Sequence, residues 1–539
     1  MFIISGAVVL AFLLVGVLFV DATNTAATGA LDFIARYFGW FYVLAATFFL
    51  VFVIGIAVSR HGKLRLGPDD SRPEFSTTAW FAMLFTAGMG IGLVFYGVYE
   101  PAYHASDPPV GQGGTPAAVD QGMNWTLFHW GLHPWAIYCV LGLSMGYFCF
   151  RKGLPLRPAS ALYPLIGKRI YGWPGNLIDI LAVFGTLFGL ATSLGLGTQQ
   201  INAGLETLFG FPNNLVSQVL IVAVITAVAV ISVMFGIDKG IRRLSVLNLF
   251  LAVLLMLFIF IVGPKLFILT GLADYTGNYL QNIVGSSLTV FNPNTSADEF
   301  SWQSTWTLFY WGWWISWSPF VGMFVARISR GRTIRQFVTG LLAAPVGASI
   351  VWFTVLGGSG LFYETVTGTV DISGQDAELA LFSLMEALPI GAILATIASV
   401  LAIVVVTLFF ATSSDSGSLV VDMLTNGGDP HPIWQQRMFW AVLEGAITAV
   451  LLVVGGATAL TALQAASITT GLPFAIVLLL VSYGLLVGLQ NDRFPIPAVD
   501  RAGSERSGVS GYAASEGAKD EESEAPPDPE KKTGATVGD

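Results

Sequence analysis

Two aromatic stretches of this sequence carry side chains that could bind an organic cation. The first, residues 309–320, reads FYWGWWISWSPF. On a helix that turns by about 100° per residue, Trp313, Trp314 and Trp317 fall on one face, whereas Trp311 points further round and is expected to serve packing. A ring face attracts a cation by about 0.5–2 kcal/mol, so several rings are needed to hold a quaternary ammonium group, which forms no conventional hydrogen bonds.

The second stretch, residues 128–138, reads FHWGLHPWAIY and offers a comparable face. Trp130, Trp135 and Tyr138 fall within a sector of about 140° on a helix. Two such faces could enclose the cation. The alternatives are ordinary core packing and an aromatic belt at the lipid interface, although the tryptophan face of residues 309–320 runs deeper than a belt, which decorates helix ends. The residues alone leave the cage and the packing interpretations open.

A glycine-rich run, TAGMGIGLVFYG at residues 86–97, contains the closely spaced Gly88, Gly90 and Gly92. A dinucleotide-binding loop would need a preceding strand and a βαβ unit, which this apolar region does not predict. Gly88 and Gly92 also fit the GxxxG pattern of close helix packing. The run could instead interrupt a membrane helix and free backbone groups for a solute or an ion, and Pro319 would interrupt the aromatic stretch similarly.

A cluster of hydroxyls occurs in FFATSSDSGS, residues 409–418, where Thr412, Ser413 and Ser414 precede Asp415. Hydrolase chemistry is not predicted, because no histidine lies nearby in this apolar run. The hydroxyls could bond back to their own helix. With carbonyls freed in the glycine run, they could also form an oxygen cage for a hard cation such as sodium. Asp415, at the expected cytoplasmic end of its run, could instead face water.

Metal and disulfide chemistry are not predicted. His129 and His133 have the spacing of a helical metal site, but no carboxylate or thiolate accompanies them in the sequence. Cys139 and Cys149 share one apolar run, so they indicate no disulfide framework. We therefore expect neither enzymatic activity nor a cofactor.

The composition indicates that lipid is the solvent for most of this chain. Of 539 residues, 54% are hydrophobic and 11% are charged, and the mean hydropathy is +0.70, whereas soluble proteins carry about 25% charged residues. Runs of about 20 apolar residues cross a bilayer core of about 30 Å. They predict an all-α integral membrane protein with twelve spans, at residues 2–20, 39–59, 78–99, 126–149, 173–199, 214–236, 244–271, 304–328, 337–363, 389–413, 433–455 and 470–489. The first run lacks the basic region of a signal peptide and is interpreted as a span.

The distribution of charge predicts the orientation of the spans. Basic residues follow every second span, whereas alternate loops such as 111–124 and 364–380 carry none. By the positive-inside rule both termini are cytoplasmic in a multi-pass protein of the plasma (inner) membrane. Residues 275–288 are expected to form an amphipathic helix along the outer surface. The acidic tail, 500–539, is expected to be disordered. The basic residues used here are Arg60, Lys63, Arg65, Arg72, Arg151, Lys152, Arg157, Lys168, Arg169, Lys239, Arg242, Arg243, Arg327, Arg330, Arg332 and Arg335.

At these motifs the chain closely resembles the betaine/choline/carnitine transporter family. The resemblance covers residues 2–490 and is most specific in WTLFYWGWWISWSPFVGMFVARISRGR. It implies that spans 3–7 and 8–12 form two inverted five-helix repeats of the sodium-symporter (LeuT-like) type, usually in a homotrimer. The corresponding divisions are two N-terminal spans and a cytoplasmic loop (1–77), the first repeat (78–271), the outer helix and loop (272–303), the second repeat (304–490) and the acidic cytoplasmic tail (491–539).

The resemblance also implies the site residues. The trimethylammonium cage corresponds to Trp130, Trp135, Tyr138 and Trp314, with Trp313 and Trp317 as neighbours along the pathway and backbone groups at Gly88, Met89 and Gly90 for the solute's carboxylate. The sodium site corresponds to main-chain oxygens near Thr86, Met89 and Phe409 and to the hydroxyls of Thr412 and Ser413. A second sodium position would involve Thr186 and Phe320, but Leu190 stands where sodium-coupled betaine carriers have a second threonine.

The expected function is therefore sodium-coupled import of a quaternary ammonium compatible solute, glycine betaine above all, by alternating access, in osmoprotection. Gly92 lacks the acidic side chain found there in some proton-coupled choline carriers, which favours sodium. The alternatives are a proton-coupled choline, ectoine or carnitine carrier and a non-transporting osmosensor or receptor. The expected partners are the solute, sodium as the coupling ion, the lipid bilayer and further copies of the chain, without nucleic acid.

Overall fold

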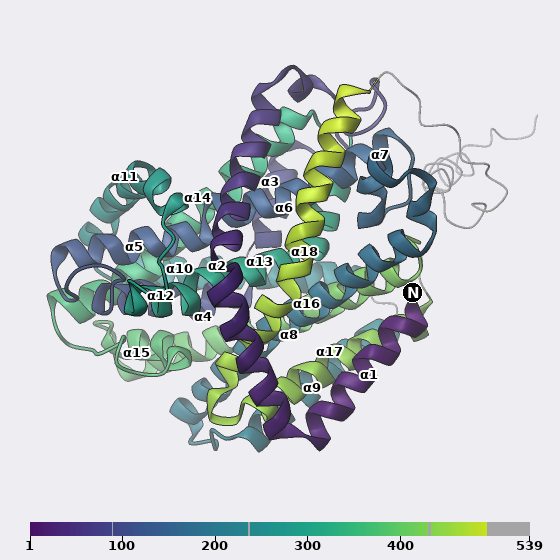
Figure 1. The fold of residues 1–539 in the computed structure, drawn as a ribbon. Helices are drawn as coiled ribbons and strands as arrows, with labels where there is room; N and C mark the ends of the chain where they lie inside the picture. The colour runs from purple at the N-terminus through teal and green to yellow at the C-terminus, as the bar shows by residue number, and fades with distance from the viewer. Residues whose placement is uncertain (89, 235–237, 430–432, 493–539) are drawn as a thin grey trace, which may run out of the picture.

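The computed structural model describes residues 1–88, 90–234, 238–429 and 433–492. Within these ranges every regular element is helical, apart from an isolated bridge between Arg65 and Thr333. The all-α class predicted from the sequence is confirmed for this part of the chain. Figure 1 shows long helices of different tilt packed around a central α13.

The helices are α1 (Phe2–Leu18), α2 (Val20–Val58), α3 (Thr77–Gly88), α4 (Ile91–Ser106), α5 (Pro116–Trp130), α6 (Leu132–Met145), α7 (Tyr163–Ile166), α8 (Trp173–Phe209), α9 (Leu215–Met234), α10 (Asp238–Val262), α11 (Lys265–Leu288), α12 (Ala297–Gln303), α13 (Phe309–Arg327), α14 (Ile334–Leu361), α15 (Ala380–Ala387), α16 (Ala392–Thr425), α17 (Trp434–Gly455) and α18 (Ala459–Gln490). Wider π-helical turns occupy Gly146–Arg151, Ser304–Leu308 and Phe362–Val366.

Nine helices of the described residues are long and apolar enough to cross a membrane. Three other predicted spans fall on shorter or broken elements. The first is α1, with 17 residues, the third is divided between α3 and α4, and the eighth is divided between a π turn and α13. The multi-pass character is thus supported, and the count of twelve spans and the inverted repeats stay predictions.

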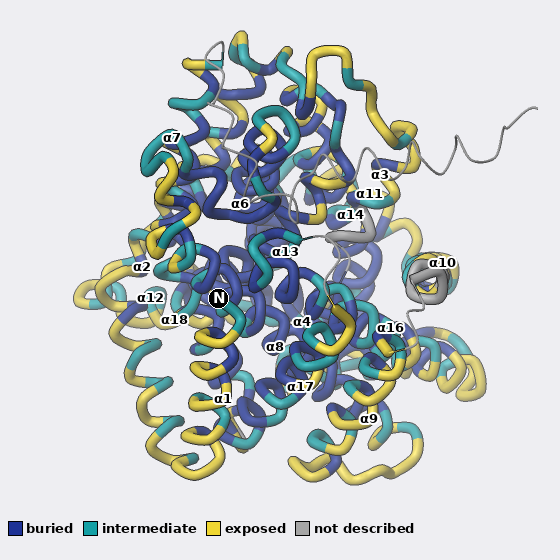
Figure 2. The backbone as a smooth tube through the Cα atoms, turned by 90° about the vertical axis from the view of Figure 1, so that its right-hand side faces the viewer, coloured by how far each residue is buried: buried dark blue, intermediate teal, exposed yellow. Residues whose placement is uncertain are grey.

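The outer helices present apolar surface, as lipid-facing helices do. Only 28% of the apolar segment of α9 and 22% of that of α10 is buried, against 94% for Pro116–Arg151. Figure 2 shows exposed residues along α1 and α9 and buried ones around α13 and α8. Val216, Val224 and Phe250 are among the exposed large side chains. A soluble protein rarely leaves such continuous apolar surface in water.

The central helix packs closely because glycines remove side chains at its crossings. A Cβ atom on Gly185 of α8 would lie 2.9 Å from the carbonyl oxygen of Ser316 in α13, and one on Gly312 would lie 2.8 Å from Cα of Ile468 in α18. Close approach of this kind lets membrane helices associate through van der Waals contact. The aromatic stretch on α13 is therefore held at the centre of the molecule by α8 and α18.

The seventh span ends earlier than predicted. The sequence predicts a span over 244–271 and a separate outer helix over 275–288, but α10 ends at Val262 and α11 begins at Lys265. Pro264 lies between them, and proline lacks the N–H needed to continue a helical ladder. One face of α11 buries Tyr275 and Tyr279, while Leu280 and Val284 are exposed, so α11 carries apolar side chains on both faces.

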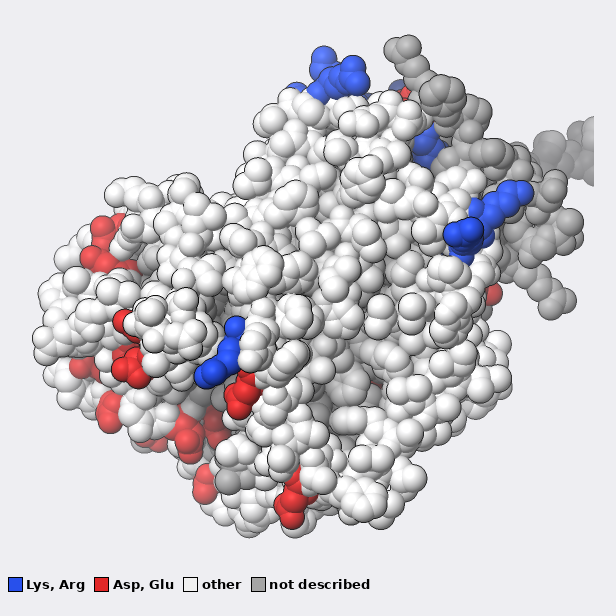
Figure 3. Space-filling view, in the orientation of Figure 1, with Lys and Arg blue, Asp and Glu red and all other residues white. Residues whose placement is uncertain are grey.

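Charge is distributed unevenly over the surface. Figure 3 shows Lys and Arg mostly at the top and right of the view, and most of the Asp and Glu at the lower left, where Figure 1 draws α5, α11, α12 and α15. This separation agrees with the alternation of basic and acidic loops in the sequence. It supports opposite sides for the two kinds of loop, while the cytoplasmic location of the termini stays a prediction.

An ion-pair network ties the end of α18 to the π turn that follows α6. The carboxylate of Asp492 accepts from Arg151 Nη2 at 2.8 Å, from Lys152 Nζ at 2.8 Å and from the Tyr147 hydroxyl at 2.8 Å. Burial opposes ionisation of Asp492, but these hydrogen bonds outweigh it and hold its pKa below the ordinary value. Arg151 also pairs with Asp69 at 2.7 Å, whose side chain is 84% exposed.

Replacing Asp492 by Asn is expected to lower the free energy of unfolding by about 1–3 kcal/mol at neutral pH, because it leaves two partly buried cations less well paired. Since the folded carboxyl titrates below the unfolded value of about 3.9, the loss should be constant between pH 5 and 8 and shrink only in stronger acid. Thermal unfolding in detergent measures it. The control is Asp69→Asn, an exposed partner expected to cost under about 1 kcal/mol. Equal effects of the two variants would contradict this account.

Candidate functional site

The glycine-rich run interrupts a helix, as predicted. Helix α3 ends at Gly88 and α4 begins at Ile91, with Gly90 in an extended conformation at φ −142° and ψ −177°. A Cβ atom on Gly92 would lie 2.6 Å from Trp313 and 2.7 Å from Trp130, so bare backbone faces the rings of both aromatic stretches. Met89, expected to bind both solute and ion, lies outside the described residues, as does the side chain of Thr86.

A second interruption lies in the other aromatic stretch and was not predicted. Helix α5 ends at Trp130 and α6 begins at Leu132, with Gly131 between them at φ −99° and ψ −127°. The freed N–H of Leu132 donates to the hydroxyl of Tyr279 in α11 at 2.9 Å. The sequence feature that could have predicted this interruption is Gly131 followed by Pro134. Proline lacks the N–H that would donate to the backbone carbonyl of Trp130 in a continuous helix.

The interruption predicted at Pro319 is wrong. Helix α13 continues through Pro319 to Arg327. Proline leaves the carbonyl of Ile315 without its helical donor, and the Ser318 hydroxyl donates to that carbonyl at 2.7 Å instead. The serine before the proline therefore repairs the helix. The irregular part of this segment is the π turn at Ser304–Leu308, upstream of the tryptophans.

Three tryptophans form a row along α13. Trp313 and Trp314 are stacked with ring centroids 4.6 Å apart and 14° between their planes. Trp317 continues the row, 6.2 Å from Trp314, and Phe320 stacks on Trp317 at 5.8 Å. The predicted common face of Trp313, Trp314 and Trp317 is confirmed.

The rings of α5 and α6 stand against this row. Trp130 meets Trp314 edge to face, with centroids 4.9 Å apart and planes at 70°. Tyr138 lies 6.3 Å from Trp314 at 77° and 6.4 Å from Trp317 at 78°, and Trp135 adjoins Tyr138 at 5.5 Å. We call the six rings, all of them buried, the aromatic cage: Trp130, Trp135, Tyr138, Trp313, Trp314 and Trp317.

The cage contains hydrogen-bonding groups that are used and others that are not. Trp314 Nε1 donates to the carbonyl of His129 at 2.9 Å, and Trp313 Nε1 donates to that of Gly189 at 3.2 Å. The hydroxyl of Tyr138 and Nε1 of Trp317 are buried and have no partner within the described part of the chain. Both groups therefore have hydrogen-bonding capacity that a polar ligand in the cage could use.

Trp311 lies outside the cage, as predicted. Its ring stacks on His133 at 5.5 Å and meets Phe128 at 5.2 Å. His133 bonds through Nε2 to the hydroxyl of Ser287 at 2.9 Å. The two histidines of the HWGLH motif have different hydrogen-bond partners, since His129 contacts Glu100 and Thr307.

A buried carboxylate next to the cage was missed in the sequence. Glu100 of α4 accepts from Trp130 Nε1 at 2.7 Å and from the Tyr310 hydroxyl, and its other oxygen lies 2.8 Å from His129 Nδ1 and 3.3 Å from His104 Nε2. The sequence signal was an acidic residue directly after the predicted span 78–99, since ionisable residues at membrane depth suggest function.

The hydroxyls expected to bind sodium lie on α16. Thr412 donates to the carbonyl of Leu408 at 2.8 Å and contacts that of Phe409 at 3.3 Å, so it bonds back to its own helix. Ser413 is half-buried. Asp415 does not face water, because it is buried and pairs with Arg437 of α17 at 2.8 Å. Since Met89 and the Thr86 side chain are undescribed, the proposed ion site stays a prediction.

The second predicted sodium position combines a buried hydroxyl at Thr186 with an apolar side chain one turn later. Thr186 of α8 is buried, and its hydroxyl has no partner among the described residues. One turn later Leu190 is buried against α16, where its Cδ1 would lie 2.2 Å from a Cβ atom on Gly417. The Leu190 side chain thus packs between α8 and α16, where a threonine would instead present a hydroxyl.

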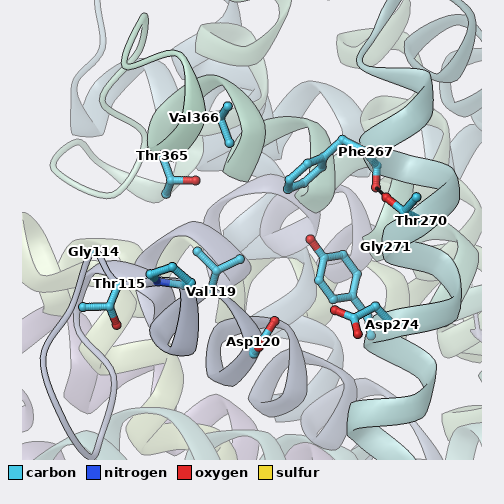
Figure 4. Close-up of a pocket in the computed structure, with 12 residues that line it drawn as sticks. Gly114, Thr115, Val119, Asp120, Phe267, Thr270, Gly271, Asp274, Thr365 and Val366 are labelled. Atoms are coloured by element: carbon cyan, nitrogen blue, oxygen red, sulfur yellow. Dashed lines mark hydrogen bonds between the residues drawn. The ribbon is translucent and has the colours of Figure 1, made fainter.

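A separate cavity of about 570 Å³ lies between α5, α11 and the π turn after α14. Figure 4 shows the carboxylates of Asp120 and Asp274 and the ring of Phe267 around it. No residue of the aromatic cage lines it. It therefore does not belong to the site that the sequence predicts.

Long apolar helices, two of them broken beside a buried aromatic cage, have the architecture of a multi-pass membrane transporter. The chain belongs to the BCCT family of betaine/carnitine/choline transporters, whose sequence model matches residues 1–494. The family consists of transporters, so this protein is a transporter and not an enzyme.

Several relatives are similar over most of their length. The chain is 44% identical to a glycine betaine transporter of Acinetobacter baylyi over 496 residues, 91% of this chain and 73% of the relative. It is 44% identical to a probable glycine betaine transporter of Desulfitobacterium hafniense, over 91% of this chain and 97% of the relative. It is 42% identical to the glycine betaine transporter OpuD of Bacillus subtilis, over 93% and 96%.

Replacing Gly92 by Ala should disturb the cage, because the new methyl group would lie 2.6 Å and 2.7 Å from two tryptophan rings. Overpacking of this kind typically costs about 1–3 kcal/mol. Gly90→Ala is the matched control, since its methyl group would lie an ordinary 3.5 Å from Trp317. Thermal unfolding in detergent should show a clear loss for Gly92→Ala and little change for Gly90→Ala. The reverse order would contradict the described packing.

Proposed function

We propose that this protein imports glycine betaine, or a closely related quaternary ammonium solute, by sodium-coupled alternating access across the plasma membrane. The observation that carries the proposal is the buried aromatic cage with two unused hydrogen-bonding groups. Relatives at 42–44% identity over most of the chain are named glycine betaine transporters, which supports the same solute here.

The cage matches the cationic end of such a solute. A trimethylammonium group spreads its charge over methyl groups, so ring faces suit it better than carboxylates or carbonyls. Trp130, Trp314 and Tyr138 present mutually tilted rings in one buried place. Displacement of Tyr138 or Trp130 by a small side-chain rotation would admit the methyl groups between them.

The unused groups match the anionic end. The Tyr138 hydroxyl and Trp317 Nε1 can both donate a hydrogen bond to a carboxylate. Backbone N–H groups at Gly88 and Gly90, on either side of the interruption, would supply further donors of the kind that transporters direct at anionic groups. A zwitterion with methylated nitrogen and a carboxylate therefore fits the site better than choline, which has a hydroxyl.

Sodium would bind between the interrupted α3–α4 segment and α16. Its ligands would be main-chain oxygens near Thr86, Met89 and Phe409 with the hydroxyls of Thr412 and Ser413. Rotation of the Thr412 hydroxyl away from the Leu408 carbonyl would free it for the ion. Leu190 next to Thr186 argues against a second ion, so the proposal rests on one.

The proposal extends to the wider architecture of the protein. We propose that the chain has twelve spans with two inverted repeats, that both termini are cytoplasmic and that three copies form a homotrimer. The separation of charge in Figure 3 supports the orientation, and the exposed apolar face of α11, with Leu280 and Val284, supports contact with lipid or with another copy.

Uptake of labelled glycine betaine by proteoliposomes separates the rival functions. The proposal requires saturable accumulation driven by an inward sodium gradient. Accumulation driven by a proton gradient without sodium would instead indicate a proton-coupled carrier. Binding without flux would indicate a sensor or receptor and would contradict the proposal.

Trp314→Leu should weaken glycine betaine binding at least tenfold, because it removes the ring that contacts both Trp130 and Tyr138. Trp311→Phe is the control, because Trp311 stacks on His133 outside the cage. Titration of the purified protein measures both. Unchanged affinity in Trp314→Leu, or an equal loss in Trp311→Phe, would show that the cage does not bind the solute.

The double variant Thr412→Ala/Ser413→Ala should raise the sodium concentration for half-maximal uptake at least tenfold, because it removes both hydroxyl ligands. Affinity for glycine betaine at saturating sodium should change less. Thr407→Ala on the same helix is the control, since its hydroxyl also bonds back to the helix, to Ile403, at 2.8 Å. A sodium response unaltered in the double variant would place the ion elsewhere.

A further inference from the structure

Next to the aromatic cage lies a carboxylate that accepts a hydrogen bond from one of the cage rings, Trp130. Glu100 is fully buried in α4. Oε2 accepts from Trp130 Nε1 at 2.7 Å and from the Tyr310 hydroxyl. Oε1 lies 2.8 Å from His129 Nδ1 and 3.3 Å from His104 Nε2. Each oxygen of the carboxylate thus has two neighbouring groups that are able to donate.

This pattern of partners suits an ionised carboxylate. An indole N–H can only donate, and an ionised carboxylate can only accept. His129 bonds through Nε2 to the hydroxyl of Thr307 at 3.0 Å, so a neutral ring can accept there and donate from Nδ1 to Glu100. Hydrogen bonds of this kind favour the charged form of a carboxyl group.

The spacing of Glu100 and the two histidines is also close enough for a metal site. Ligand atoms of Glu100, His104 and His129 lie within 4.8 Å of one another. However, both nitrogens of His129 are engaged in hydrogen bonds, and the carboxylate is also engaged by Trp130 and Tyr310. Hydrogen-bonding groups of the protein itself thus surround both oxygens of Glu100.

The charge has no permanent cationic partner among the described residues. The only basic groups within 4 Å of Glu100 there are the rings of His104 and His129. A buried charge is costly unless a charge of opposite sign approaches it. A cation bound in the neighbouring cage would supply that charge.

The two donors connect Glu100 directly to the cage. Trp130 is a cage ring, and Tyr310 stacks on Trp314 at 5.8 Å and 22° and meets Trp130 edge to face at 5.4 Å and 67°. An N–H or O–H that donates to a carboxylate leaves its ring richer in electrons. The ring face then attracts a cation more strongly. The carboxylate would thus attract a cation in the cage in two ways. It makes the ring faces richer in electrons, and its own negative charge acts on the cation across a site of low dielectric constant.

We propose that Glu100 is the buried counter-ion of the bound ammonium group and makes the cage select a solute with a cationic end over one of the same shape whose corresponding end is uncharged. This inference rests on the proposed function. Glu100 is a specificity-determining residue and does not touch the solute, because the rings of Trp130 and Tyr310 stand between them.

The test compares two solutes that differ only in the charge of one end. In glycine betaine the carboxylate carries a trimethylammonium group, and in 3,3-dimethylbutanoate it carries a tert-butyl group of nearly the same shape. Calorimetric titration of the full-length protein in lipid nanodiscs, with sodium, gives both affinities for the wild type and for Glu100→Gln, which keeps the size of the side chain but removes its charge.

Glu100→Gln is expected to weaken glycine betaine binding by about tenfold, or about 1.4 kcal/mol, and to leave the affinity for 3,3-dimethylbutanoate within threefold. Thr307→Val is the matched control, because it removes the hydroxyl bonded to His129 and leaves the cage and the carboxylate in place. Both affinities should be unchanged in it. If Glu100→Gln does not fold, Tyr310→Phe removes one donor and keeps the ring, and should weaken glycine betaine binding alone by about threefold.

The outcomes separate the two levels of the proposal. If Glu100→Gln lowers the affinity for both solutes equally, Glu100 has a structural role. If it lowers neither affinity, the charge of Glu100 does not affect binding in the cage. Both results overturn the counter-ion and leave the proposed function in place. A wild type that binds neither solute overturns the proposed function and the counter-ion together.

Discussion

The arrangement of this site depends on the close approach of bare backbone to aromatic rings. Gly92 lies so near Trp130 and Trp313 that no side chain fits between them. Gly185 and Gly312 similarly let α8 and α18 reach the backbone of α13. In lipid there is little hydrophobic drive to bring helices together, so contact distance between small residues decides which surfaces meet. Glycine at these crossings fixes the tryptophan row at the centre of the protein, where a solute can be enclosed.

Glycine also weakens helices, and the protein satisfies the backbone groups that are freed. The Leu132 N–H donates to Tyr279, and the His129 carbonyl accepts from Trp314. At Pro319 the Ser318 hydroxyl takes over the carbonyl that the proline leaves, and that helix stays whole. Unpaired backbone groups at membrane depth cost several kcal/mol each. An interruption therefore persists only where a neighbouring element provides partners, as α11 and α13 do beside the cage.

Helical periodicity was enough to separate the cage face of Trp313, Trp314 and Trp317 from Trp311, because these residues share one rigid helix. The break between Gly88 and Ile91 was also predictable, since three glycines in a short run weaken the ladder locally. Pro319 was misjudged because its repair depends on the rotamer of Ser318. Glu100 was missed because its partners come from α5 and α13, and sequence spacing carries no information about contacts between helices distant in the chain. For the same reason the sequence left open whether Asp415 faces water, whereas in the structure it pairs with Arg437 of α17.

The account's central claim is that the rings of α5, α6 and α13 hold the ammonium group of the solute. A structure of the protein with glycine betaine bound tests it most directly. The account predicts the nitrogen within about 6 Å of the ring centroids of Trp130, Tyr138 and Trp314, the range of a cation–π contact. The solute bound instead in the cavity lined by Asp120 and Asp274 (Figure 4), with the cage rings still in mutual contact, would contradict it.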